Sequence, residues 1–261
     1  MEELIERSDL NLAEFYREQS RRSGGTVLDE DGLVLYTSAH PLPVLVNGVL
    51  RLDARLPAET VLSRAHRFFR AHRRGFTVWI RTHADADLER AAAATGLRPM
   101  GDDPGMVLDH RLPDADPPEG VSLRRVDDEH GAADFAAVNS AAYATYGAPL
   151  DLAPTLFARP ESLVGPHLAA FVAYADGAPA AAAMTMVSHG VAGIYWVGTV
   201  PESRGRGLAE LVTRAAGNAG FDRGASVAAL QASTMGEPLY RRMGYVAITR
   251  YRQLVRFEPP D

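Results

Sequence analysis

The residues best suited to chemistry form one short stretch, which reads Arg-Gly-Arg-Gly-Leu-Ala over residues 204–209. An apolar run over residues 194–200, rich in β-branched and aromatic side chains, precedes it and predicts a strand. Apolar residues at spacings of three and four follow it and predict a helix. The first N–H groups of a helix have no partner within the helix, and glycine lets an anion approach the main chain. With two arginines beside it, the stretch predicts a phosphate site.

The kind of phosphate ligand follows from the patterns that this loop does and does not match. The loop lacks the Gly-Lys-Ser/Thr ending of a nucleotide-binding P-loop. It also lacks the third glycine of a dinucleotide-binding loop, because Glu210 stands in that place. It does match the pattern Arg/Gln-x-x-Gly-x-Gly/Ala, which runs from Arg204 to Ala209.

The sequence downstream of the loop supports this match. Residues 226–232 predict a second strand, and residues 237–243 predict a short helix that Gly244 ends. Residues 239–245 read Leu-Tyr-Arg-Arg-Met-Gly-Tyr, which is similar to a Leu-Tyr-x-x-x-Gly-Phe signature. In this order, the loop, strand and short helix resemble the GCN5-related N-acetyltransferase (GNAT) family over roughly residues 120–257. The resemblance implies that the loop holds the pyrophosphate of acetyl-CoA.

The resemblance also implies roles for individual residues. Tyr240 stands where the family has a helix tyrosine near the CoA sulfur, so it is the predicted general acid for the leaving thiolate. Ser233 stands where many members have an Asn that touches CoA, so this contact lacks the amide. The predicted acetyl-CoA contacts are Val197, Gly198, Thr199, Arg204, Gly205, Arg206, Gly207, Leu208, Ala209 and Ser233. The first three of these would bind through main-chain groups.

The general base is not identified by the sequence. Family members often carry a Glu on one of the two strands predicted over residues 194–200 and 225–232, but neither holds a carboxylate or a His here. The resemblance places Tyr143 and Tyr146 in the segment that shapes the acceptor pocket. The candidates left open for deprotonating the amine are Tyr143, Tyr146, Asp151, Glu161 and His189.

Composition excludes several other classes of function. The chain has 261 residues, of which 46% are hydrophobic and 23% charged, as in ordinary globular proteins. The absence of Cys excludes disulfides and thiol catalysis, and the eight His residues show no metal-ligand spacing. A net charge of −6 argues against nucleic-acid binding. The acidic start and the lack of a long apolar run predict a cytoplasmic protein without a membrane segment.

The order of the predicted elements divides the chain into two similar units. Strand, helix, strand, short helix, Gly and strand follow one another in residues 44–110 and again in residues 191–257. We expect a degenerate GNAT-like domain over residues 1–112, a Pro- and acid-rich linker over 113–120, and a catalytic GNAT domain over 121–261. Each would be an α/β unit with a mixed sheet flanked by helices. An unrelated α/β fold for the first unit stays open.

Two local features of the predicted elements can be compared directly with the structure. Asn47-Gly48 suits a type I′ turn and predicts a hairpin over residues 44–50. A short helix is expected over residues 151–158. In the first unit, the helix that follows the first strand begins with Pro57 and Glu59 instead of glycines and arginines. A carboxylate would repel a phosphate there, so this unit is not expected to bind CoA.

The leading interpretation is an acetyl-CoA-dependent N-acetyltransferase that transfers an acetyl group to a primary amine by direct attack. The acceptor would be a small molecule or a peptide, and the protein a monomer or a homodimer. The alternatives are a non-catalytic CoA-binding sensor or interaction module, and a purely structural tandem domain. The intact loop and Tyr240 favour the enzyme, whereas the missing strand carboxylate favours a non-catalytic protein.

Overall fold

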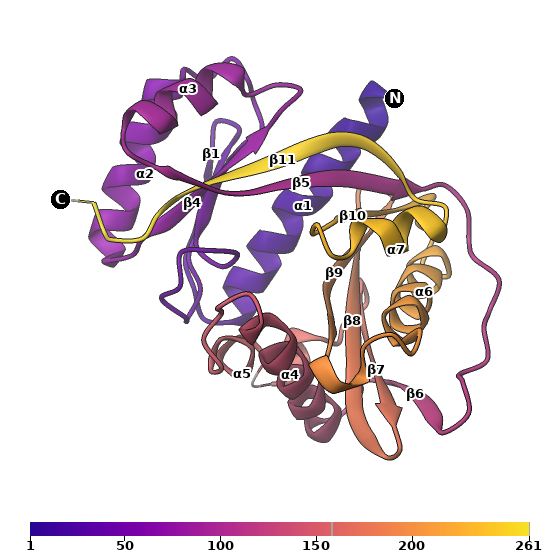
Figure 1. The fold of residues 1–261 in the computed structure, drawn as a ribbon. Coiled ribbons are helices and arrows are strands. Elements are labelled where there is room, and N and C mark those ends of the chain that lie inside the picture. The colour runs from indigo at the N-terminus through magenta and orange to yellow at the C-terminus, as the bar shows by residue number, and fades with distance from the viewer. Residues whose placement is uncertain (158, 261) are drawn as a thin grey trace.

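The structure, a computed structural model, describes residues 1–157 and 159–260. Its first half begins with a long helix that crosses the middle of the molecule (Figure 1). The elements of this half are α1 (Glu2–Arg22), β1 (Val27–Glu30), β2 (Leu33–Tyr36), β3 (Gly48–Arg51), α2 (Ala58–His72), β4 (Phe76–Arg81), α3 (Ala86–Ala94) and β5 (Arg98–Leu108). An irregular segment over residues 109–120 then leads into the second half.

The second half repeats the same succession of strands and helices, preceded by an additional strand and helices. Its elements are β6 (Val121–Arg125), α4 (Glu129–Ala144), α5 (Leu152–Leu156), η1 (Pro160–Ser162), β7 (Leu168–Ala175), β8 (Ala178–Ser188), β9 (Val191–Thr199), η2 (Pro201–Ser203), α6 (Leu208–Phe221), β10 (Val227–Gln231), α7 (Glu237–Arg242) and β11 (Val246–Arg256). Gly96 and Gly244 follow α3 and α7 with φ angles of 84° and 96°, so both short helices end in the same way. The predicted helix over residues 151–158 is observed as α5, and residue 158 lies outside the described residues.

The strands described form one sheet in the order β1-β2-β3-β4-β11-β5-β10-β9-β8-β7-β6. The parallel pairs β3/β4 and β9/β10 stand in equivalent places in the two halves. Between them, the long antiparallel partners β5 and β11 run side by side across the centre (Figure 1). Strand β11 of the second half pairs with β4 of the first, and β5 of the first half pairs with β10 of the second. Each half therefore completes the sheet of the other.

Helix α1 fastens the first half to the second. The Asn11 side chain donates hydrogen bonds to the main-chain oxygens of Met186 and Val191, both at 3.1 Å, and accepts one from the Tyr195 hydroxyl at 2.7 Å. Gly193 allows this close approach, because a Cβ there would lie 2.0 Å from the Asn11 oxygen. The amphipathic helix that residues 1–22 form thus packs on β8 and β9 as well as on β1 and β2.

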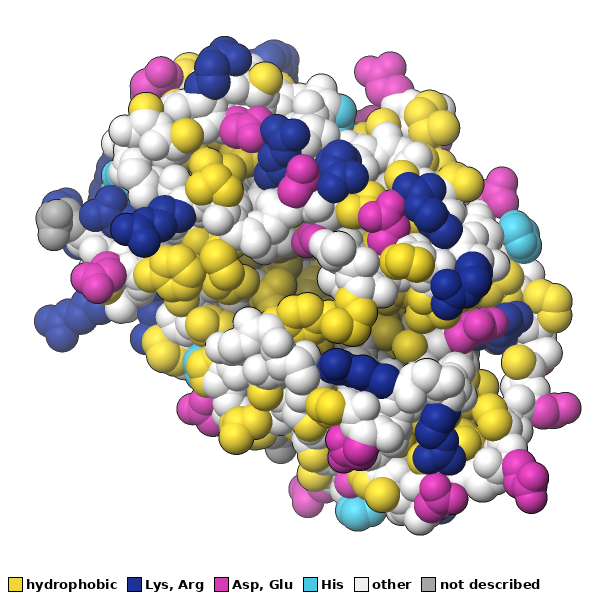
Figure 2. Space-filling view, in the orientation of Figure 1, with side chains coloured by type: hydrophobic (Ala, Val, Ile, Leu, Met, Phe, Trp, Pro, Cys, Tyr) yellow, Lys and Arg dark blue, Asp and Glu magenta, His cyan; other side chains and the backbone are white. Residues whose placement is uncertain are grey.

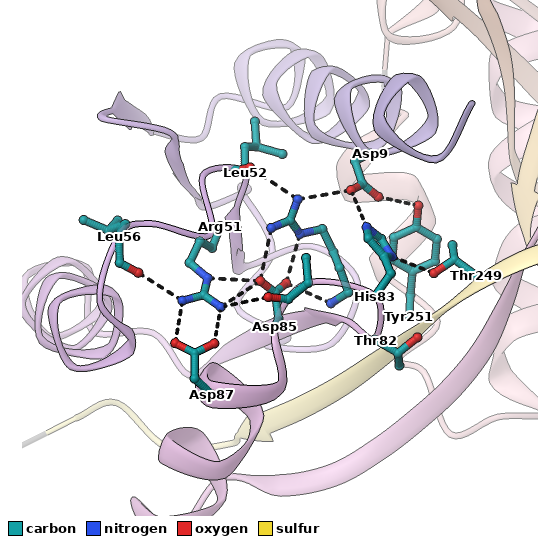
Figure 3. A network of polar contacts seen from close by, with 12 residues as sticks. Asp9, Arg51, Leu52, Leu56, Thr82, His83, Asp85, Asp87, Thr249 and Tyr251 are labelled. Carbon is teal, nitrogen blue, oxygen red and sulfur yellow. Dashed lines mark hydrogen bonds and ion pairs between the residues drawn. The ribbon is translucent and has the colours of Figure 1, made fainter. Parts of the chain in front are cut away.

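A buried ionic network fills the space beyond the paired residues of β3 and β4 (Figure 3). Asp85, whose side chain is fully buried, binds both Arg51 at 3.0 Å and Arg81 at 2.9 Å. Arg51 also binds Asp87 at 2.6 Å, and Arg81 reaches Asp9 of α1 at 3.1 Å. Buried charges need such pairing. Here the paired side chains fill the space beyond the last paired residues of β3 and β4.

The prediction of a type I′ turn at Asn47-Gly48 is wrong. Neither residue has a positive φ angle, although a type I′ turn requires it at both central positions. The Asn47 side chain instead accepts a hydrogen bond from the Ser38 N–H and donates to the main-chain oxygens of His40 and Leu42. Asn47 therefore organises the loop before β3, and the strand begins at Gly48. Asp176 and Gly177, by contrast, have positive φ angles and form a hairpin turn, with β7 and β8 paired on either side of it.

Candidate active site

The loop before α6 has the geometry of an anion site. Gly205 and Gly207 have φ angles of 77° and 78°, in the left-handed region that glycine adopts without strain. Gly207 is the N-cap of α6, so the first N–H groups of a 14-residue helix point out past it. A Cβ placed at either glycine would have no atom within 4 Å, so the space in front of the loop is open to a ligand. The residues present therefore fit a phosphate group.

This loop forms one end of a groove of about 450 Å³ between α4, β9 and α7. Figure 2 shows the corresponding face of the molecule hollowed at its centre and lined by hydrophobic side chains. The predicted contacts that line the groove are Val197, Gly198, Thr199, Arg204, Gly205, Gly207, Leu208, Ala209 and Ser233. The predicted site residues are thus brought together, with the exception of Arg206.

The arginines around the groove differ from the expectation. Arg204 lines the groove, and its guanidinium donates to the Thr145 hydroxyl at 3.1 Å. Arg206 turns away and forms an ion pair of 3.3 Å with Asp176 in the β7–β8 turn. Arg242 of α7 lines the groove instead, although the loop pattern gave no signal for it. The cationic partner of Arg204 thus comes from a helix more than 30 residues further along the chain.

A bulge in β9 shapes the wall of the groove. The register against β8 shifts between Ala182 and Met184, opposite the segment that holds Trp196, and Trp196 has a φ of 52°. On the far side of the bulge, Gly198 lies so close to α4 that a Cβ would be 2.9 Å from Ala142. Beyond Gly193, β9 and β10 no longer pair, and the groove enters the sheet at this separation.

Tyr240 stands where the groove meets a second, smaller cavity. The side chain is buried, and burial raises the pKa of the Tyr240 phenol above its ordinary value, which keeps the hydroxyl protonated. Ser233 lies beside it and accepts a hydrogen bond from the Gly236 N–H at 3.2 Å, which orders the turn into α7. Both residues line the groove and the smaller cavity.

The smaller cavity has a volume of about 130 Å³ and lies between the two halves. It shares Tyr143, Val197, Ser233 and Tyr240 with the groove, so the two spaces adjoin at these residues. Seven aromatic side chains line it: Phe15, Tyr16, Trp79, Tyr143, Tyr195, Trp196 and Tyr240. Phe15 of α1 stacks on Tyr195 of β9, with ring centroids 3.6 Å apart. Polar side chains come from Asp103, Gln231 and Gln253, none of which the sequence singled out.

Asp103 is the carboxylate in this cavity. It lies on β5, and its side chain accepts a hydrogen bond from Gln253 of β11 at 2.9 Å. Burial and the negative charge of Asp102 raise the pKa of Asp103 to about 6, and Arg250 opposes the rise. Sequence reasoning missed this residue because it belongs to the first half, more than 90 positions before the loop.

The other candidates for the acceptor site are spread over the surface. Tyr146 is exposed and lines the groove, where its hydroxyl contacts the Met235 sulfur at 3.6 Å. Asp151 is exposed and pairs with His40 at 3.3 Å. The main-chain oxygens of Glu161 and His189 accept hydrogen bonds from arginines of α1, and neither side chain lines the groove or the cavity. Among the described candidates, only Tyr143 lines both spaces.

Comparison with known proteins supports the same assignment. The family model of the acetyltransferase (GNAT) domain matches residues 183–248. No curated protein matches the sequence. A GCN5-related N-acetyltransferase structure from Kribbella flavida superposes with a TM-score of 0.70 at 20% identity, over 95% of this chain and 96% of that one. A second from Sphaerobacter thermophilus has a TM-score of 0.58 at 19% identity, over 90% and 84%.

The tandem arrangement also has a counterpart among solved structures. A tandem GNAT protein from the clavulanic acid biosynthesis pathway superposes with a TM-score of 0.58 at 18% identity, over 88% of this chain and 79% of that one. The matched segment, with the loop, the bulged strand and the Tyr240 helix, places residues 183–248 in the GNAT family, and the whole chain has the fold of its tandem members. The protein is an acyltransferase. The sequence-based prediction is confirmed for the fold, and for the family over residues 183–248.

Within residues 1–157 and 159–260, no helix is long and apolar enough to cross a membrane. The same residues contain no cluster of three or more His, Cys, Asp or Glu side chains arranged to hold a metal ion.

Proposed function

We propose that the protein transfers the acetyl group of acetyl-CoA to a primary amine by direct attack of the amine on the thioester. One observation carries this proposal: the groove with the glycine loop adjoins a separate cavity that holds a carboxylate, and four residues line both. A long thioester in the groove would present its acyl end to an acceptor in the cavity. Such a two-substrate site would have little use in a protein that only senses CoA.

The residues of the groove have separate tasks in this reaction. Arg204, Arg242 and the N–H groups after Gly207 would bind the pyrophosphate. Main-chain groups of Val197 and its neighbours on β9 would bind the pantetheine arm and the thioester oxygen, where negative charge develops. Tyr240, protonated because it is buried, would donate its proton to the leaving thiolate.

We also propose that residues 1–112 and 121–261 are tandem units and that only the second binds CoA. In the second unit, the strands β9 and β10 separate around the groove. In the first unit, the equivalent separation of β3 and β4 is filled by the ion pairs of Arg51, Arg81 and Asp85. Helix α2 begins with Pro57 as its N-cap and Glu59 in its first turn, so its N-terminus offers a carboxylate where the second unit offers glycines.

Thiol release from acetyl-CoA in the presence of different amines tests the proposal. The panel would contain aromatic and aliphatic monoamines, polyamines, amino acids, and peptides with free N-terminal and lysine amines. Titration calorimetry on the full chain would measure acetyl-CoA binding in parallel. Amine-dependent thiol release supports the proposal. Tight binding of acetyl-CoA without thiol release for any amine would instead support a non-catalytic CoA-binding module.

A further inference from the structure

The cavity beyond Tyr240 is built by both halves of the chain. Tyr16, Leu45, Trp79 and Asp103 belong to the first half, and strand β9 and helix α7 of the second half close the opposite side. The first unit, which has lost the features of a CoA site, therefore supplies a wall of the second unit's cavity. This follows from the shared strands, since β5 brings Asp103 to the edge of β10.

Backbone strain marks the same cavity. Among the described residues other than glycine, six have a positive φ angle. Two of the six line the cavity: Leu45, with a φ of 69° in the turn before β3, and Trp196, with a φ of 52° within β9. For such side chains, a left-handed backbone costs on the order of 1–3 kcal/mol and persists where the surroundings impose it. The cavity is thus held in a defined shape.

Asp103 differs in charge from the other residues that line this cavity. It is the one acidic side chain among the described lining residues, and no Arg or His stands among them. Its hydrogen bond from Gln253 leaves the carboxylate with further acceptor capacity. Tyr143 and Tyr240 line the cavity with it, so Asp103 shares a small space with the predicted acid.

We propose that Asp103, contributed by the first unit, is the general base for the acceptor, and that the acceptor is a compact primary ammonium ion with an aromatic or aliphatic body and no carboxylate. This inference rests on the proposed acetyl transfer and assigns the base that the sequence left open. It also gives the first unit a part in the reaction.

The proton and bond changes balance without any further reactant. Asp103 takes one proton from the bound ammonium, and the free amine attacks the thioester carbon to form a C–N bond. The C–S bond then breaks, and Tyr240 gives its proton to the thiolate. The second proton lost by the nitrogen restores Tyr240, and the proton on Asp103 passes to water. The net products are the acetamide, free CoA and one proton.

Size and charge select this acceptor class. A dry cavity of about 150 Å³ is known to hold benzene, so about 130 Å³ admits a group of similar or smaller size. The aromatic faces attract a cation, and the carboxylate pairs with it. A carboxylate on the acceptor would be repelled by Asp103, and no arginine among the described lining residues would pair with it. Repulsion should therefore exclude ordinary amino acids.

Several groups set the charge state of Asp103 and must be considered in any pH experiment. Asp102 stands next to it on β5, and Arg250 of β11 acts on both carboxylates. Gln253 donates to it from the same strand, and Tyr143 of α4 lies close enough to interact with it. Because the pKa of Asp103 is about 6, the base is ionised at neutral pH and is lost as pH falls below 6.

The first test compares Asp103→Asn with Asp102→Asn in the full chain. Asparagine can keep the hydrogen bond from Gln253 but cannot accept the proton. We expect Asp103→Asn to lower kcat by about 10²–10⁴-fold, to leave acetyl-CoA affinity unchanged and to lose the fall in rate below pH 6. Asp102→Asn removes the same charge from an exposed neighbour, so it should keep the wild-type rate at pH 8. The acidic limb of the pH–rate profile of this variant should move to lower pH, because Asp102 raises the pKa of Asp103 in the wild type.

The second test uses a matched pair of acceptors, 3-methylbutylamine and leucine, which differ by one carboxylate. We expect at least a tenfold preference in kcat/KM for the amine without the carboxylate. Binding of 3-methylbutylamine, followed by tryptophan fluorescence, needs no turnover and should weaken at least tenfold in Asp103→Asn. No thiol release in the wild type with any amine would contradict the acetyl transfer itself. Equal rates or equal amine affinities for wild type and Asp103→Asn would contradict only the role of Asp103.

Discussion

The hydroxyl of Tyr251 donates a 2.7 Å hydrogen bond to the carboxylate of Asp9, which lies 242 positions earlier in the chain. Tyr251 belongs to β11 of the second half and Asp9 to α1 of the first, and both side chains are buried. Asp9 also binds Arg81 at 3.1 Å and His83 at 3.1 Å (Figure 3). The last strand of the chain is thus tied into the ionic network of the first unit.

Replacement of Tyr251 by Phe should destabilise both halves together. The change leaves a buried carboxylate oxygen of Asp9 without its donor, which costs about 1–3 kcal/mol. Urea unfolding followed in Trp79→Phe and Trp196→Phe backgrounds reports on one half at a time, because each half has one tryptophan. We expect the same loss at both reporters. Tyr245→Phe, at a buried tyrosine outside the network, is the control. A loss seen only at Trp79 would show that the halves unfold separately.

Replacement of Gly207 by Asp should abolish most acetyl-CoA binding. The change places a negative charge at the N-terminus of α6, where the phosphate is expected, and a charge-assisted hydrogen bond is worth roughly 1.5–3 kcal/mol. Calorimetry should therefore show affinity weakened by several kcal/mol. Gly224→Asp is the matched control, because Gly224 also has a positive φ of 88° and open space around it. A folded Gly207→Asp protein with wild-type affinity would move the CoA site away from this loop.

Replacement of Tyr240 by Phe should lower kcat with little change in acetyl-CoA binding. The ring keeps its packing, and the proton is needed only in the transition state. General acids contribute about 10²–10⁴-fold, and a thiolate is a fair leaving group, so we expect the low end. Because burial raises the pKa of Tyr240, the wild type should lose no rate through this group between pH 7 and 10. If the mutant turned over at the wild-type rate, Tyr240 would be a packing residue and not the general acid. Tyr245→Phe serves as the control.

Replacement of Asp103 by Asn should stabilise the protein at neutral pH. The folded-state pKa of about 6 lies above the ordinary value, so ionisation of Asp103 opposes folding as pH rises from 4 to 6. A rise of this size corresponds to at most about 3 kcal/mol, and partial solvent exposure reduces it to on the order of 1–2 kcal/mol. Urea midpoints should coincide at pH 3.5 and favour the mutant at pH 7.5. Coinciding midpoints at both pH values would show that Asp103 has an ordinary pKa.

Local patterns predicted the second unit well. The loop from Gly205 to Gly207, helix α6 and the end of α7 at Gly244 depend on glycine conformations and apolar spacing that a few neighbouring residues determine. The start of α4 is equally local, because the side chain of its N-cap, Asp128, accepts a hydrogen bond from the Gly131 N–H at 2.7 Å. Such features need no knowledge of the rest of the chain.

Long-range contacts explain what the sequence did not predict. Asp103 reaches the cavity only because β5 pairs with β10, and no local pattern specifies which strands exchange. Arg206 forms its ion pair with Asp176, so its orientation depends on where the β7–β8 turn lies. Arg242, which lines the groove, comes from a different helix. The pair Asn47-Gly48 is typical of a turn, but the Asn47 side chain is fully buried and forms hydrogen bonds with three main-chain groups of the preceding loop.

The place of β11 between β4 and β5 has a consequence during synthesis. Both neighbours of β11 belong to the first half, and the strand that joins them begins more than 130 positions after β5 ends. Until then, β4 and β5 each present an unpaired edge, the kind of surface on which strands of other chains can pair. The nascent first half therefore cannot close its sheet before β11 has been synthesised, and a chaperone that covers strand edges would act during that interval.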